Sequence, residues 1–242
     1  MVIHVVTLFP EMFSGVFGTS ILKRARRDRR IDIRVVPLRT FGVGPHRQTD
    51  DYPFGGGEGM VLRADVVVPA VEWAMMHQAS PARVLVTSPQ GRLFDQRLAE
   101  ELAQSEHLII VAGHYEGLDE RARLLLNAEE VSIGDFVLTG GELPAMVMVD
   151  AVARLIPGVL GAKDGARHDS FSREHGWLEG PQYTRPEEYR GLQVPEVLLS
   201  GNHQAIRAYQ ESMAELWTKT RRPDLLNPLS PEGTHDEGRD ID

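Results

Sequence analysis

The chain contains no cysteine. This absence excludes disulfide bonds and every metal or iron–sulfur site that depends on thiolate ligands. The sequence does contain nine histidines, but none of them occurs in an HExxH motif or a comparable ligand spacing. We therefore expect no resident metal of that kind. The sequence does not show whether the protein uses a loosely bound divalent cation.

Long apolar segments are also lacking. No apolar run reaches the ~20 residues that a helix needs to cross a bilayer. The first residues, MVIHVVTLFPEMF, have no basic leader before their apolar run, which predicts that the chain carries no signal peptide. We expect a soluble cytoplasmic protein with no membrane contact.

Positive charge is scarce overall, yet it is unevenly distributed. The formal net charge is -9, but residues 1–50 hold nine Lys/Arg against four Asp/Glu. Binding depends on the local field rather than on the total charge, so an acidic protein can still have an RNA-binding face. The predicted helix Ile21–Arg30 contains most of this positive charge. It is either a solvated helix face or a phosphate-binding surface, and the sequence does not decide between them.

Strand-like and helix-like segments alternate along most of the chain, which predicts an α/β fold with a parallel sheet. A length of 242 residues fits one large domain or a domain with a smaller companion. The predicted strands are 2–8, 31–38, 83–87, 108–112 and 130–133, and the main predicted helices are 65–78, 95–104 and 142–156. The last helix is apolar on more than one face, so it is a dimer interface or a central core helix.

Glycine-rich loops follow two of these strands, at 112–117 and 134–142, and Ser88–Gly91 follows a third. Ligands of open α/β sheets bind beyond the carboxyl ends of the strands. Glycine lets the backbone approach a flat ligand closely, so these loops predict a pocket lined by backbone. The alternative is that the glycines only form tight turns. The long segment Thr40–Gly59 is either a lid or RNA-contacting loop, or a mobile surface loop.

The predicted pattern changes after residue 160. We expect a first domain at 1–160, a flexible linker at 161–176 and a small, mostly helical unit at 177–227. Gly201-Asn202 is the expected start of its main helix, which runs to Thr220. Residues 228–242 are polar and acidic and are predicted to be disordered.

Several motifs identify a family resemblance. They are GHYEGLDER, IGDFVLTGGELP, IPGVL, DSF, YTRP and VPEVLLSGNH. In this order they resemble the bacterial tRNA (guanine-N1)-methyltransferases, which belong to the knotted, S-adenosylmethionine-dependent SPOUT superfamily. The resemblance extends from TLFPEMF to RRPDLL. It implies a deep trefoil knot in the parallel sheet domain and a C-terminal domain that binds tRNA.

The resemblance also implies which residues bind S-adenosylmethionine. Ile133, Leu138 and Pro144 are suitable apolar walls for the adenine, and Glu116 suits the ribose hydroxyls. The implied cofactor-binding residues are Val86, Thr87, Ser88, Pro89, Gly113, Tyr115, Glu116, Ile133, Gly134, Asp135, Phe136, Val137, Leu138, Gly140, Gly141 and Pro144. Two positions depart from the family pattern, because His114 stands where arginine is expected and Phe136 where tyrosine is expected.

The implied reaction is methylation of guanine N1 at tRNA position 37. N1 carries a proton that must leave as the methyl group arrives, so a general base is needed. The resemblance assigns this role to Asp169, and it assigns Arg154 to the negative charge that develops toward O6. It further implies a homodimer whose sites are shared between subunits. The alternatives are a related methyltransferase with another RNA target and a non-catalytic RNA-binding module.

Overall fold

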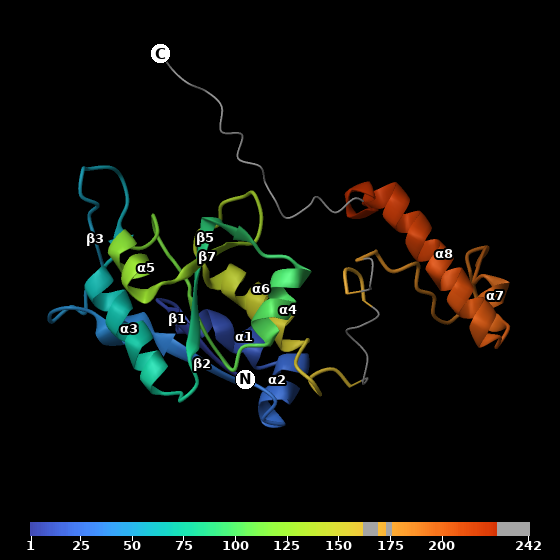
Figure 1. Ribbon diagram of the computed structural model, residues 1–242, viewed down its shortest axis with the longest axis horizontal. Coiled ribbons are helices and arrows are strands. Elements are labelled where there is room, and N and C mark those ends of the chain that lie inside the picture. Colours follow the sequence, from blue (N-terminus) through green and yellow to red (C-terminus); the bar gives the residue numbers. More distant parts are fainter. Residues whose placement is uncertain (162–168, 173–175, 227–242) are drawn as a thin grey trace, which may run out of the picture. The chain divides into compact units, whose positions relative to one another are not determined.

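The computed structural model describes residues 1–161, 169–172 and 176–226 (Figure 1). The chain forms two compact units, Met1–Lys163 and Asp164–Asp242. The predicted acidic tail and most of the predicted linker 161–176 lie outside the described residues.

A five-stranded sheet forms the centre of the first unit. Its strands, in spatial order, are β2 (Asp32–Pro37), β1 (Val2–Thr7), β6 (His107–Val111), β5 (Ala82–Leu93) and β7 (Glu129–Ser132). All four neighbouring pairs are parallel. The predicted parallel α/β sheet is therefore confirmed.

Helices cover both faces of this sheet (Figure 1). One face packs against α3 (Ala64–Met76) and α5 (Glu120–Leu126). The other packs against α1 (Phe13–Phe17), α2 (Ser20–Arg27), α4 (Gln96–Ala103) and α6 (Glu142–Ala153). Strand side chains alternate between the two cores. Burial on both faces explains why the strands are short, nearly continuous apolar runs in the sequence.

Two of the predicted helices show how local sequence sets their ends and their packing. The Asp95 carboxylate accepts a hydrogen bond from the backbone N–H of Leu98 at 2.8 Å, so Asp95 caps α4. Helix α6 buries eight residues, which identifies it as a core helix, while Leu143 and Val147 remain about half exposed.

The predicted end of the third strand at Thr87 is wrong. Strand β5 continues to Leu93, with an irregularity between Thr87 and Arg92, both of which pair with Val131 of β7. The chain returns to β7 so closely at Gly91 that a Cβ there would lie 2.2 Å from the Glu130 carbonyl carbon. The expected loop is thus a bulge inside a strand, made possible by a glycine without a side chain.

The segment predicted as one loop, Thr40–Gly59, contains more regular structure than expected. A 3-10 turn, η2 (Leu38–Phe41), overlaps its start, and β3 (Asp50–Asp51) pairs antiparallel with β4 (Val61–Leu62). The pairing closes the base of a shorter loop, which a pattern of single residues cannot reveal. Another 3-10 turn, η1 (Pro10–Met12), follows β1.

The second unit contains α7 (Glu196–Leu199), α8 (His203–Arg221), η3 (Pro223–Leu226) and a small hairpin of β8 (Glu188–Tyr189) and β9 (Leu192–Gln193). The predicted start of its long helix is confirmed. The side-chain oxygen of Asn202 accepts from the backbone N–H groups of Gln204 and Ala205.

Few side chains of the second unit are buried. Among its described residues, only Ala214 and Thr218 are buried. The Thr218 hydroxyl donates to the Ala214 carbonyl at 2.7 Å and accepts from the Leu178 N–H at 3.0 Å. The preceding segment is thereby attached to α8.

Candidate functional site

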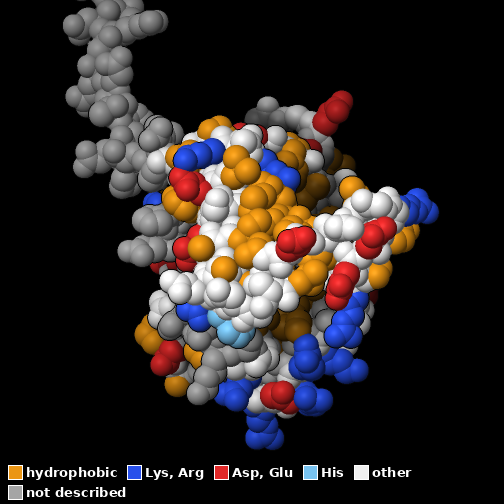
Figure 2. Space-filling model, turned by 90° about the vertical axis from the view of Figure 1, so that its right-hand side faces the viewer, with side chains coloured by type: hydrophobic (Ala, Val, Ile, Leu, Met, Phe, Trp, Pro, Cys, Tyr) orange, Lys and Arg blue, Asp and Glu red, His pale blue; other side chains and the backbone are white. Residues whose placement is uncertain are grey.

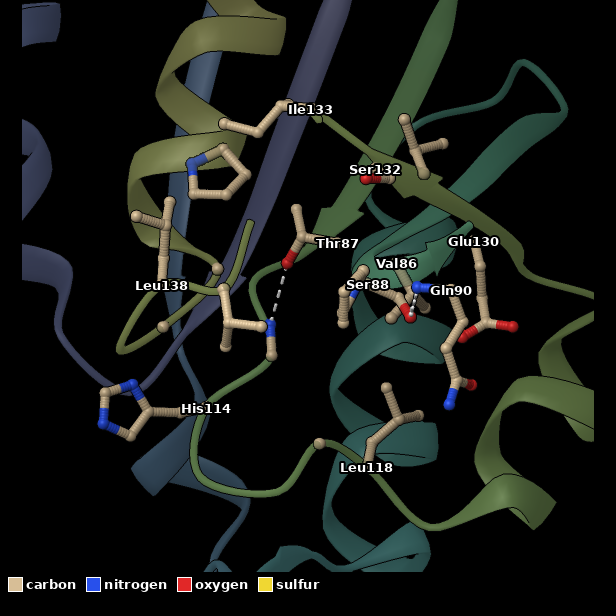
Figure 3. Close-up of a pocket in the computed structure, with 18 of the residues that line it drawn as sticks. Val86, Thr87, Ser88, Gln90, His114, Leu118, Glu130, Ser132, Ile133 and Leu138 are labelled. Carbon is tan, nitrogen blue, oxygen red and sulfur yellow. Dashed lines mark hydrogen bonds between the residues drawn. The ribbon is translucent and has the colours of Figure 1, made fainter. Parts of the chain in front are cut away.

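A cavity of about 300 Å³ lies at the carboxyl ends of β5, β6 and β7 (Figure 3). This is the edge at which open parallel sheets bind ligands. Most of its lining belongs to three segments: the end of β5 with its bulge, the loop after β6, and β7 with its following loop. All three belong to the first unit.

Hydrogen bonds join these three segments in a row. The Thr87 hydroxyl accepts from the Gly113 N–H at 3.1 Å, a contact drawn in Figure 3, and lies 3.3 Å from the Val111 carbonyl, to which it donates. The Gly113 carbonyl in turn accepts from the Gly141 N–H at 2.6 Å. Residues far apart in the sequence therefore form one continuous wall.

Gly141 is needed in this wall because of space. Its φ of -84° is accessible to any residue. A Cβ at Gly141, however, would lie 1.9 Å from the Thr87 hydroxyl oxygen and 2.7 Å from the Gly113 nitrogen. A side chain here would force the segments apart, so the lack of one at Gly141 lets the three segments pack closely.

The cavity has an apolar side and a polar side. Ile133 and Leu138 border one side, and Gln90 and Glu130 lie on the other (Figure 3). Arg123 lies near the polar side, with its Nε 3.8 Å from a Glu130 carboxylate oxygen. Such a cavity suits a flat apolar group that carries polar substituents at one end.

The rim of the cavity touches the loop between β3 and β4. The Glu116 N–H donates to the Met60 carbonyl at 3.1 Å, and a Cβ at Gly59 would lie 2.6 Å from the Glu116 carboxylate. Arg63 holds the base of this loop through Asp51, at 3.3 Å. The base is fixed against the cavity, whereas Phe54 at its tip is 97% exposed.

A buried carboxylate lies behind the wall. Glu142, the first residue of α6, is 1% exposed, and its Oε1 accepts from the Thr7 hydroxyl at 2.9 Å. Its Oε2 lies 3.6 Å from Nδ1 of His114, whose ring points away from the other labelled lining residues in Figure 3. Glu142 thus connects β1, α6 and the loop after β6. Sequence reasoning missed it, because a glutamate in the first helical turn is common for helix-dipole reasons alone.

The cavity contains nearly all of the residues implied by the resemblance. Every implied cofactor residue except Asp135 lines it. Asp135 is exposed because it is the middle residue of a tight turn, in which the Phe136 N–H donates to the Gly134 carbonyl at 2.9 Å. Sequence reasoning did not assign the further lining residues Gln90, Gly117, Leu118, Glu120, Arg123, Glu130, Val131 and Ser132.

The two implied catalytic residues do not line the cavity. Arg154 is the C-terminal cap of α6 in the first unit, and Asp169 belongs to the second unit. The segment that holds Asp169 is attached locally, since the Phe171 N–H donates to the Trp177 carbonyl and the Glu179 N–H to the Ser170 hydroxyl, both at 3.0 Å.

The described part of the chain contains neither a grouped set of metal-ligating side chains nor a helix suited to a bilayer. Within residues 1–161, 169–172 and 176–226, no three His, Cys, Asp or Glu side chains are grouped so that they could hold a metal ion. None of the helices in those ranges combines the length and apolar character that a bilayer crossing requires.

Comparison with known proteins assigns the family. The family model described as tRNA (Guanine-1)-methyltransferase TrmD matches residues 1–228, which span the first unit and most of the second. The chain belongs to this family. The cavity and the segment around Asp169 therefore both lie within the TrmD family region.

Curated relatives agree with this assignment. The tRNA (guanine-N(1)-)-methyltransferase of Moorella thermoacetica is 57% identical over 235 residues, covering 96% of this chain and 93% of that protein. The protein of the same name from Bacillus licheniformis is 51% identical over 234 residues, covering 96% of each chain. That of Staphylococcus carnosus is 51% identical over 234 residues, covering 96% of this chain and 94% of its own.

Proposed function

We propose that this protein transfers a methyl group from S-adenosylmethionine to N1 of guanosine at tRNA position 37, acting in the cytoplasm. The observation that carries the proposal is the cavity at the ends of β5, β6 and β7, in a chain of the TrmD family. The relatives' names indicate a guanine N1 acceptor in tRNA. The position within the tRNA rests on the family resemblance of the motifs.

The residues of the cavity fit the proposed cofactor. An adenine ring suits the space beside Ile133, Leu138 and Pro144, which are apolar, while the nearby glycines expose backbone N–H and C=O groups to its edge. Glu116 and Glu130 offer carboxylates for ribose hydroxyls and for the positive sulfonium. When bound, the cofactor supplies an electrophilic methyl group.

The acceptor side of the reaction requires proton removal and charge stabilisation. In the proposed mechanism, the Asp169 carboxylate accepts the N1 proton of guanine as the N1–methyl bond forms. The Arg154 guanidinium stabilises the negative charge that develops on O6.

We further propose that the enzyme is a homodimer in which each site combines the cavity of one subunit with Asp169 of its partner. Two observations support this. The cavity is formed wholly by the first unit, whereas Asp169 belongs to the second. Helix α6, which begins at the cavity and ends at Arg154, exposes Leu143 and Val147 on one face. The trefoil knot and the tRNA-binding role of the second unit are part of the same proposal.

Mass spectrometry of tRNA nucleosides tests the proposed reaction. Unmodified tRNA is incubated with the protein and S-adenosylmethionine, and the digest is mapped to the sequence. We expect 1-methylguanosine at position 37, and none with the Asp169→Asn variant. Methylation at another nucleotide would indicate a related methyltransferase with a different target. No methylated nucleoside at all would contradict the proposal.

A further inference from the structure

Helix α2 is held firmly in the first unit, so its outer face has a defined orientation. Leu22 and Ala25 are buried in the core beneath it. Arg26 also has a structural role, because its guanidinium donates to the Phe17 carbonyl at 3.1 Å and to the Ile33 carbonyl at 3.5 Å. The basic side chains on the other positions are therefore displayed by a fixed element.

The outer face has a large excess of positive charge. We define the α2 basic surface as the exposed side chains Lys23, Arg24, Arg27, Arg29 and Arg30. The one acidic residue among positions 20–31 is Asp28, and it binds Arg27 at 2.8 Å.

The pKa of Asp28 is lowered, first by the hydrogen bond from Arg27 and also by the charges of Arg30 and Arg24. Several cations thus share this single carboxylate. The next acidic residue in the sequence, Asp32, pairs with Arg34 at 2.6 Å. Within the described part of the chain, Lys23, Arg24 and Arg29 have no hydrogen-bond or ion-pair partner for their side chains.

Helix stability does not explain so many cations. The helix dipole favours basic residues in the last turn of α2, where Arg24, Arg26 and Arg27 lie. Arg29 and Arg30, however, lie beyond the helix end. Like charges four residues apart, such as Lys23 and Arg27, repel each other. The surface therefore costs stability, which an anionic partner would offset.

The surface lies beside the part of the chain that leads away from α6. A Cβ at Gly158 would come within 2.9 Å of the Arg30 guanidinium carbon, and Gly158 follows Arg154 by only four residues. Figure 2 shows Lys and Arg side chains gathered at the lower edge of the face that it draws. The positive charge is thus close to the arginine that the proposed function places at the acceptor base.

We propose that the α2 basic surface binds the phosphate backbone of the tRNA substrate. This inference rests on the proposed function and adds a contact surface to it. Lys and Arg contacts to phosphate fix the orientation of a nucleic acid without reading its bases. An anionic membrane fits less well, because the apolar face of α2 is buried in the core and is not available to enter a bilayer.

Salt dependence of tRNA binding provides the test. In the full-length protein, Lys23→Gln, Arg24→Gln and Arg29→Gln are combined, and the dissociation constant for unmodified tRNA is measured by fluorescence anisotropy at several salt concentrations. Each lost phosphate contact removes ~0.7–0.9 from the slope of log affinity against log salt. We expect the slope to become shallower by about 2 and the affinity at low salt to fall about tenfold or more.

Two matched variants separate charge from other effects. The combination Lys23→Arg, Arg24→Lys and Arg29→Lys keeps every charge and should keep the parental slope. Arg97→Gln removes an exposed arginine from α4 and should leave both slope and affinity unchanged. In all variants, calorimetric affinity for S-adenosylmethionine should match the parent, and the melting temperature should not fall below that of the parent.

The possible outcomes distinguish this inference from the proposed function. If the parent methylates tRNA but the neutralised variant keeps its affinity and slope, the α2 basic surface does not bind tRNA. If that variant instead loses binding to vesicles of anionic lipid while tRNA binding is unchanged, the partner is a membrane and the inference is wrong. If the parent neither binds nor methylates tRNA, the proposed function itself fails.

Discussion

The two units of the chain differ in what holds them together. The first has a sheet buried on both faces between two apolar clusters. The second buries only Ala214 and Thr218 among its described residues. The cavity belongs to the first and Asp169 to the second. A rigid core suits a preorganised pocket, whereas a unit with little core of its own suits a role that depends on binding a partner.

The largest effect that we expect comes from the second unit. Asp169→Asn keeps the side-chain volume but cannot accept the N1 proton, so turnover should fall roughly 10²- to 10⁴-fold. Calorimetry should show nearly parental affinity for S-adenosylmethionine, because Asp169 does not line the cavity. Turnover within a few-fold of the parent would remove Asp169 from the role of base.

The matching change in the first unit is Gly141→Val. A branched side chain would overlap the Thr87 hydroxyl, where even a Cβ comes within 1.9 Å. We expect affinity for S-adenosylmethionine to fall about a hundredfold, equivalent to about 2.7 kcal/mol, with the circular dichroism spectrum retained. Gly15→Ala is the control, since nothing lies within 4 Å of a Cβ there. An unaltered affinity in Gly141→Val would show that this wall does not shape the site.

Mixing the Asp169→Asn and Gly141→Val variants tests whether the cavity of one subunit and Asp169 of its partner form one active site. Random subunit exchange makes about half of the dimers heterodimeric, and each heterodimer has one intact composite site. Roughly a quarter of parental methylation should therefore return. If each site lay within one chain, every site would carry one lesion, and activity would stay at the sum of the separate variants.

The smallest effect concerns acid stability, and it should be confined to the first unit. Burial lowers the pKa of His4 to about 4. His107 contributes to this lower pKa, and its Nε2 lies 2.9 Å from Nδ1 of His4. The unfolded chain binds the proton more readily, so stability is fully present above pH ~6.5 and falls as the pH drops toward 4. The loss by pH 5 should be about 2 kcal/mol.

Calorimetric melting between pH 7 and pH 5 checks this prediction. The transition of the first unit should move to lower temperature, and His4→Gln should make that shift smaller. Equal pH dependence in the parent and in His4→Gln would contradict the assignment to His4.

The sequence predicted the parallel sheet well because burial on both faces leaves a direct mark. Runs such as Leu108–Ala112 are apolar without alternation, as expected for such strands. The helix caps Asp95 and Asn202 were also predictable, since a cap depends only on residues within one turn. The bulge in β5 was not, because it depends on how closely Gly91 approaches β7.

The candidate site was only partly predictable from the sequence. The glycine loops indicated a pocket, and the family motifs indicated its residues. Glu120 and Arg123 were missed because α5 reaches the cavity only through tertiary packing. Asp135 was expected there, yet the local turn directs it to solvent. The Thr7–Glu142 contact joins residues 135 positions apart, which no local pattern can reveal.

The row of hydrogen bonds from Thr87 through Gly113 to Gly141 has a consequence for synthesis of the protein. A nascent chain that ends before Gly141 lacks one side of the cavity, although four of the five sheet strands lie entirely before Asn127. A small ligand of the cavity cannot stabilise such an intermediate. It adds its binding free energy only after the third segment has left the ribosome, and so it selectively protects completed first units from proteolysis.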